Sequence, residues 1–246
     1  MPLRAVLCVA EKPSICNAIA AALARGAEMR TTGRTPPLHE FEGDFRGETV
    51  AYRVTSVLGH LYELDFPEGY NDWDAIDPLE LFAAPVERRA TKGAVVRLLK
   101  EAALGCAALV LWLDCDREGE NICYEVLGAV SSSLAPGADV LRAKFSAVTP
   151  DDISRAMRSL GRPNRAEALA VDARQELDLK VGVAFTRRQT RFFAPKYAGL
   201  DAKCVSYGPC QTPTLGFCVA RHLAIQRFEP AEFWTLRCDC LARGRR

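Results

Sequence analysis

The feature that most constrains the fold is the segment at residues 106–121, which reads CAALVLWLDCDREGEN. Its apolar run is typical of a strand buried on both faces, as in a parallel sheet covered by helices. The run ends in four acids within seven positions, Asp114, Asp116, Glu118 and Glu120. Crowded carboxylates repel one another, and hard cations such as Mg²⁺ bind carboxylate oxygens and relieve that repulsion. The segment therefore predicts a buried strand that ends at a cation site.

Apolar runs alternate with helical patterns through about residue 150, which indicates an α/β fold. Predicted strands cover residues 4–10, 106–114 and 140–148, with a hairpin at 38–57. Predicted helices cover residues 11–26, 91–105, 118–130 and a segment that starts at Thr149 and Pro150. Strands and helices that alternate in this way favour a parallel sheet.

A mostly helical part is expected after residue 160, with helices at 164–192 and 211–228 and a strand at 232–242. Four apolar residues of the long helix recur at a spacing of four and are predicted to face a core: Ala173, Leu177, Val181 and Phe185. Another face gathers Lys180, Arg187, Arg188 and Arg191. That face is either an ordinary solvated basic surface or a surface that binds phosphates.

The two parts of the chain differ in charge. Residues 1–150 hold 15 basic and 21 acidic residues, whereas residues 151–246 hold 17 basic and 10 acidic residues. An acidic part suited to cations thus precedes a basic part suited to phosphates, which fits a nucleic-acid partner.

The ten cysteines include no CxxC pair, and most lie in apolar segments. Closely spaced cysteine pairs are usual in structural zinc sites, so reduced thiols in an intracellular protein are the favoured interpretation. No apolar run reaches the roughly 18 residues that a membrane span needs, so no membrane partner is expected.

Acids follow two of the predicted strands. Glu11 follows the strand at 4–10, and Asp114 and Asp116 follow the strand at 106–114. Ligands of parallel sheets gather at the carboxyl ends of strands, so both groups are expected at one edge. Two acids at i and i+2 can share a cation, while a separate Glu serves as general acid or base. The alternative is a solvated acidic turn.

Several motifs resemble those of one enzyme family. Glu11 followed by DCDREGEN resembles the Toprim domain. Five further segments are similar to eukaryotic type IA topoisomerases of the topoisomerase III class, in its beta branch: VAEKPS, TSVLGHLYELDFP, FSAVTPDDI, VDARQELDLKVGVAFTR and YGPCQTPTLGF. The resemblance implies a Rossmann-like Toprim domain at 1–155, followed at 160–246 by the start of a central DNA-binding domain. It also implies ATP-independent, Mg²⁺-dependent breakage, passage and rejoining of single DNA strands.

The resemblance assigns a role to individual residues. Asp114, Asp116 and Glu118 match metal-binding acids, and Glu11 matches the glutamate that handles the proton of the 3′ hydroxyl, with Lys12 beside it. The residues that match strand-gripping segments are Arg174, Lys180, Arg187, Arg188, Arg191 and Gln211. Implied partners are single-stranded DNA or RNA, an OB-fold accessory protein, a Tudor-domain scaffold and a RecQ-type helicase. The implied location is the nucleus, with the cytoplasm as an alternative.

The family's nucleophilic tyrosine has no match here, because none of the six tyrosines is followed by Pro-Arg-Thr. We therefore expect an N-terminal portion of the enzyme, which is a fragment, a truncated gene model or a degenerate copy. Two further functions stay open. One is a Mg²⁺-dependent module that binds single-stranded nucleic acid without cutting it, and the other is a nuclease that uses metal-activated water.

Overall fold

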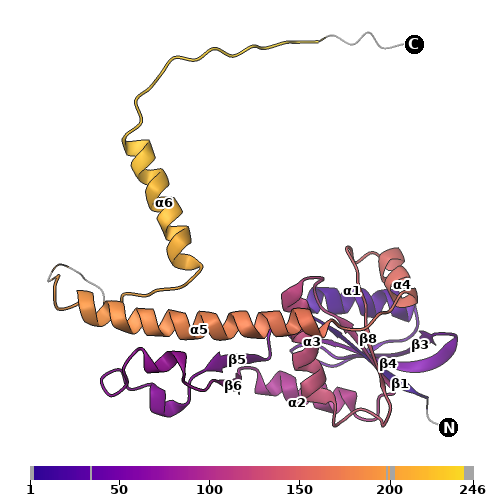
Figure 1. Cartoon of the computed structure of the whole chain (residues 1–246). Coiled ribbons are helices and arrows are strands. Elements are labelled where there is room, and N and C mark those ends of the chain that lie inside the picture. Colours follow the sequence, from indigo (N-terminus) through magenta and orange to yellow (C-terminus); the bar gives the residue numbers. More distant parts are fainter. Residues whose placement is uncertain (1–2, 34, 198, 200–202, 241–246) are drawn as a thin grey trace.

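The computed structural model describes residues 3–33, 35–197, 199 and 203–240 (Figure 1). Its centre is a six-stranded sheet in the order β2-β3-β4-β1-β7-β8. The strands are β1 (Ala5–Ala10), β2 (Arg30–Thr31), β3 (His39–Phe45), β4 (Glu48–Ser56), β7 (Ala108–Trp112) and β8 (Asp139–Arg142). The strands β4, β1, β7 and β8 are parallel, while β3 and β2 add an antiparallel edge. The predicted α/β fold with a mostly parallel sheet is confirmed.

Helices cover both faces of this sheet. Successive residues of a strand point to opposite faces, so each inner strand packs against helices on both sides. The side chains of Val6 and Cys8 pack with α1 and α4, whereas those of Leu7 and Val9 pack with α2 and α3. The covering helices are α1 (Pro13–Ala24), α2 (Gly93–Ala103), α3 (Arg117–Val130) and α4 (Pro150–Arg158). The strand β7, predicted to be buried on both faces, is buried throughout.

A second, two-stranded sheet lies outside the first. It pairs β5 (Tyr62–Asp65) with β6 (Glu87–Ala90), and the chain between them forms two short 3-10 helices, η1 (Glu68–Tyr70) and η2 (Glu80–Phe82). The long helix α5 (Arg165–Phe193) runs alongside this sheet (Figure 1). The sequence did not predict these strands, because YELD and ERRA show no apolar alternation.

The predicted core face of α5 is wrong. Leu177 and Phe185 are 62% and 44% exposed, and the buried positions include Ala168, Val171 and Ala184. With 3.6 residues per turn, a strict spacing of four drifts around the helix and leaves the side that packs on α3 and η2. Neither α5 nor any other helix among the described residues is long and apolar enough to cross a membrane.

The last described part of the chain projects away from the rest (Figure 1). The helix α6 (Gln211–Gln226) has no buried residue. The strand predicted at 232–242 is wrong over its described residues, 232–240, where Phe233 is 81% and Trp234 is 93% exposed. A strand needs a neighbour for its backbone hydrogen bonds, and no described segment lies beside this one.

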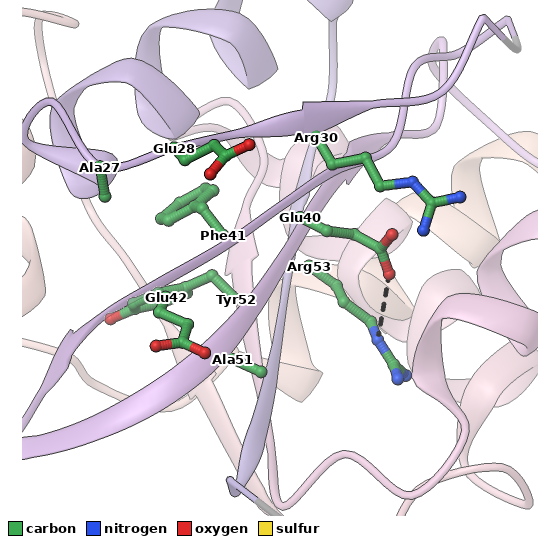
Figure 2. A pocket seen from close by; sticks show the side chains of 9 residues that line it. All are labelled: Ala27, Glu28, Arg30, Glu40, Phe41, Glu42, Ala51, Tyr52 and Arg53. Carbon is green, nitrogen blue, oxygen red and sulfur yellow. Dashed lines mark ion pairs between the residues drawn. The ribbon is translucent and has the colours of Figure 1, made fainter.

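A hollow of about 550 Å³ lies against the strands β3 and β4 (Figure 2). Arg53 stands beside it, 3.8 Å from the carboxylate of Glu40. Its guanidinium also donates to the carbonyl oxygens of Ala102 and Leu104 at the end of α2. The charged side chains of this hollow therefore tie the antiparallel edge to a covering helix.

Replacing Leu109 with Ala should lower the free energy of unfolding by about 2–5 kcal/mol, because it leaves a cavity in the core. Leu109 is fully buried on β7, whereas Leu104 is 70% exposed at the end of α2. Urea denaturation of Leu109→Ala should therefore show a clear loss and that of Leu104→Ala almost none. Equal losses would contradict the assigned core.

Candidate active site

The sheet topology brings the two groups of acids together. Strands β1 and β7 are neighbours, with Ala10 opposite Trp112, so the residues that follow them share one edge. The backbone N–H of Asp114 donates to Glu11 Oε2 at 3.2 Å. The side chain of Glu11 is 15% exposed and that of Asp114 is 32% exposed. Two residues more than a hundred positions apart thus form one partly solvated cluster, as expected for acids that follow strands of a parallel sheet.

Lys12 lies between these two acids. Its Nζ is 3.0 Å from Asp114 Oδ2 and 3.9 Å from Glu11 Oε1. The hydrogen bond to Asp114 and the negative charges nearby raise the pKa of Lys12, so the ammonium stays charged. A fixed positive charge beside the carboxylates is suited to a phosphate group.

Asp116 and Gly119 shape the start of α3. Asp116 is the N-cap, and its side chain accepts a hydrogen bond from the Gly119 backbone N–H at 2.7 Å. A Cβ at position 119 would lie 1.9 Å from the backbone oxygen of Asp114. The helix can therefore approach the acidic loop this closely only with glycine at position 119.

Glu118 faces a different set of partners. It accepts one hydrogen bond from Arg174 at 2.7 Å and faces His60 Nε2 at 3.2 Å. The other ring nitrogen of His60 is 2.9 Å from the nearly buried Glu125. The hydrogen bond to Glu125, followed by the nearby negative charges, raises the pKa of His60 against the opposing effect of burial. His60 is thus a link between two carboxylates.

Glu120, the last of the four crowded acids, points into the interior. Its side chain is 2% exposed and its Oε1 is 3.0 Å from Nε of the fully buried Arg142. The same guanidinium donates to the carbonyl oxygens of Leu111, Leu113 and Asp114, at 3.3, 2.8 and 2.7 Å. The expectation that all four acids face one cation is wrong for Glu120, because this acid neutralises a buried arginine.

The predicted strand-gripping residues of α5 and α6 do not form one surface. Arg174 contacts the acidic cluster through Glu118, and Lys180 pairs with Glu176 at 2.7 Å. Arg188 and Arg191 are exposed on α5, and Gln211 is exposed at the start of α6. All three are exposed to solvent, although the side-chain amide of Gln211 donates to the Ser206 hydroxyl at 3.2 Å.

Arg187 departs from the expected basic face, because it is only 2% exposed. It donates to the Tyr70 carbonyl at 2.7 Å and lies 5.5 Å from the ring centre of Trp73. Burial lowers the pKa of Arg187. Its position packs the segment around η1 against α5, and this is a structural role.

Within the described residues, no group of three or more His, Cys, Asp or Glu side chains is arranged to hold a metal ion. Protein cations and backbone donors instead meet Asp114, Asp116 and Glu118. Mg²⁺ often takes only one or two protein carboxylates and completes its shell with water and phosphate oxygens. The partly exposed carboxylates of this loop fit that donor chemistry, and Lys12 would compete for Asp114.

Sequence reasoning missed Arg142 and Gly119, the residues that hold the acidic loop in place. An arginine inside a predicted buried strand was a usable signal, since a buried charge needs a partner. The contact of Gly119 with Asp114 had no signal, because it depends on how closely α3 approaches β7. The two carboxylate partners of His60 come from α3, so they too depend on the packing of distant segments.

Two protein-family models match the chain. The Toprim domain matches residues 6–148, and a DNA topoisomerase family matches residues 162–246. The predicted boundary between 155 and 160 stays a prediction.

Curated relatives match almost the whole chain. It is 55% identical to DNA topoisomerase 3-beta of Arabidopsis thaliana, over 94% of this chain and 27% of that protein. It is 50% identical to DNA topoisomerase 3-beta-1 of Homo sapiens, over 96% of this chain and 28% of that protein. For human DNA topoisomerase 3-alpha the identity is 41%, over 95% and 24%. The chain thus spans about a quarter of the length of these curated relatives.

Replacing Gly119 with Ala should lower the free energy of unfolding by about 1–3 kcal/mol, the usual cost of overpacking. The added methyl group would meet backbone, which cannot rotate away. The matched control is Gly128→Ala in the same helix, where nothing lies within 4 Å of the new Cβ. That change should stabilise the protein by about 0.5–1 kcal/mol, and denaturant unfolding measures both. Two changes of the same sign would contradict the close approach.

Replacing Arg142 with Met should cost about 3–5 kcal/mol of unfolding free energy, because Glu120 is left buried without its partner. The double variant Arg142→Met, Glu120→Met removes both charges and should cost less than the single variant. Guanidinium denaturation of the wild type and both variants tests this order. A double variant that is less stable than the single one would refute an unpaired Glu120 as the cause.

Proposed function

The chain belongs to the Toprim family and continues into a DNA topoisomerase domain, and we propose that it forms the metal-and-proton half of a type IA topoisomerase of the topoisomerase III class. The proposal rests on one observation above all. Glu11 is hydrogen-bonded to the backbone of Asp114, so a proton-handling carboxylate lies directly beside the acidic loop. This is an arrangement suited to phosphoryl transfer.

Asp114, Asp116 and Glu118 are the proposed residues that hold Mg²⁺. When bound, the ion would neutralise negative charge on phosphate oxygens as a Lewis acid. In its absence the chain's own cations, Lys12 and Arg174, balance the charge of Asp114 and Glu118.

Glu11 is the proposed general acid and base. It would donate a proton to the 3′ oxygen of the DNA strand as the bond to phosphorus breaks, and accept that proton when the strand is rejoined. Its hydrogen bond from the Asp114 amide fixes the carboxylate at the edge of the sheet. Lys12 would contact the phosphate between these acids.

The proposed substrate is single-stranded DNA, with RNA as an alternative. Arg174, Arg188, Arg191 and Gln211 supply charged or polar groups along α5 and the start of α6. Lys180 is paired with Glu176 and Arg187 is buried, so their predicted part in binding has less support. Binding is expected to weaken with salt, since it rests on phosphate contacts.

The attacking tyrosine would come from a part of the enzyme outside this sequence. Tyr52 and Tyr124 donate their hydroxyls to the backbone oxygens of Asp44 and Pro163, which are structural contacts. With that tyrosine, the reaction would cut, pass and rejoin one strand without ATP. Proposed partners are an OB-fold accessory protein, a Tudor-domain scaffold or a RecQ-type helicase, and the proposed location is the nucleus, with the cytoplasm as an alternative.

The test joins residues 1–240 to the remainder of human DNA topoisomerase 3-beta-1, in place of the matching human segment. This chimera should relax negatively supercoiled DNA only when Mg²⁺ is present. Glu11→Gln should slow the reaction by a factor of about 10² or more, the usual share of general acid catalysis. Plasmid relaxation followed on gels measures this rate.

The matched control is Glu42→Gln, which removes the same charge at an exposed position of β3 and should leave the rate unchanged. A chimera that binds single strands but never cuts them would favour the non-catalytic binding module. Cut strands whose 5′ ends carry no protein would favour the metal-dependent nuclease.

A further inference from the structure

A second hollow, of about 540 Å³, lies away from the acids, between α1, α4 and the β3–β4 hairpin. The acids follow the carboxyl ends of β1 and β7, whereas the turn of this hairpin lies at the amino end of β4, which runs parallel to β1. Arg46 in that turn contacts Asp139, the first residue of β8, at 3.3 Å. The hollow therefore opens toward the opposite edge of the sheet, where no function is assigned.

Three arginines line this hollow: Arg25, Arg46 and Arg158. Asp44 is the only acidic residue in its lining. Arg46 has one ion pair, with Asp139, and both side chains are more than half exposed, so the pair holds it weakly. Within the part of the chain that the structure describes, Arg25 and Arg158 have no ion-pair partner.

Helix ends account for part of this charge. Arg25 caps the end of α1 and Arg158 is in the last turn of α4, and the carbonyl groups there attract cations. Arg46, however, belongs to a hairpin turn and not to a helix. Helix ends also do not explain why the three guanidinium groups surround an open hollow.

Four apolar residues also line the hollow, Leu23, Phe45, Met157 and Leu160, together with the polar Ser154. The guanidinium of Arg46 lies 5.3 Å from the ring centre of Phe45. A cation over an aromatic ring, beside an apolar floor, matches the two chemical parts of a nucleotide. The arginines suit its phosphate, which they bind with paired N–H donors, and the floor suits the face of its base.

We propose that this hollow is a second binding site for single-stranded nucleic acid. It takes phosphates on Arg25, Arg46 and Arg158 and one base against Phe45 and Met157. An acidic peptide would use the arginines but would leave the apolar floor without a matching group. The inference rests on the proposed function only in taking nucleic acid as the partner, because none of its residues belongs to the acidic cluster.

The experiment measures binding of a fluorescein-labelled 20-nucleotide oligothymidylate to the 246-residue chain by anisotropy, from low to moderate salt, with EDTA present. The double variant Arg25→Gln, Arg158→Gln removes two proposed phosphate contacts and keeps Arg46 and its ion pair. The slope of log K against log salt should become shallower by about 1.4, at about 0.7 per phosphate on a single strand.

The matched control is Arg97→Gln, Lys100→Gln, which removes two exposed positive charges from α2 on the other face of the sheet. Its slope should equal that of the wild type, and Arg25→Lys, Arg158→Lys should restore most of the slope. Circular dichroism melting establishes that all variants fold. Equal slopes in the glutamine variant and the wild type would overturn the proposal.

Two further outcomes separate this site from its alternatives. Binding of adenosine monophosphate that depends on the same arginines, with an unchanged oligothymidylate slope, would point to a free nucleotide and refute a strand site. Binding of a labelled poly-glutamate peptide that depends on the same arginines, with an unchanged oligothymidylate slope, would identify an acidic peptide instead. In the binding experiment, Glu11→Gln should keep the wild-type salt slope, so failure of one proposal is distinguishable from failure of the other.

Discussion

The buried ion pair between Arg142 and Glu120 is the interaction on which the candidate site depends. One guanidinium on β8 binds the carbonyl oxygens where β7 ends and the acidic loop begins. Glu120 also contacts the start of α5, because its second oxygen accepts a hydrogen bond from the backbone N–H of Asn164. The buried ion pair thus connects a strand end, the acidic loop and the start of the long helix. Such a pair adds little net stability but strongly disfavours arrangements that separate its members.

The negative charge of the three acids outside the interior is balanced in a different way. Asp114, Asp116 and Glu118 each face a different donor, supplied by Lys12, the helix backbone and Arg174. The donors come from the N-cap residue of α1, from α3 and from α5, so the acids are held from three directions. This arrangement is preorganised, which reduces the reorganisation that a reaction would otherwise require.

Much of the fold could be predicted from local patterns. The strand at 106–114 and the helix from Thr149 follow from an apolar run and from a cap, signals that need no tertiary information. The common edge of Glu11 and Asp114 followed from the rule for parallel strands. The strands of ERRA and YELD, the face of α5 and the burial of Arg187 could not be predicted. Each depends on which distant segment packs there. For example, the sequence around residue 187 does not indicate that Arg187 donates to the carbonyl of Tyr70.

The position of Arg174 has a consequence for how the site's residues will behave in genetics. Its guanidinium binds Glu118 on α3 and Asp178 one turn along its own helix. Glu118 in turn meets His60, which meets Glu125. Substitutions within this chain of contacts share partners, so their effects will not add. A substitution at one position will change the measured effect of a substitution at the next. Because of such epistasis, selection acts on the network as a whole and not on its single residues.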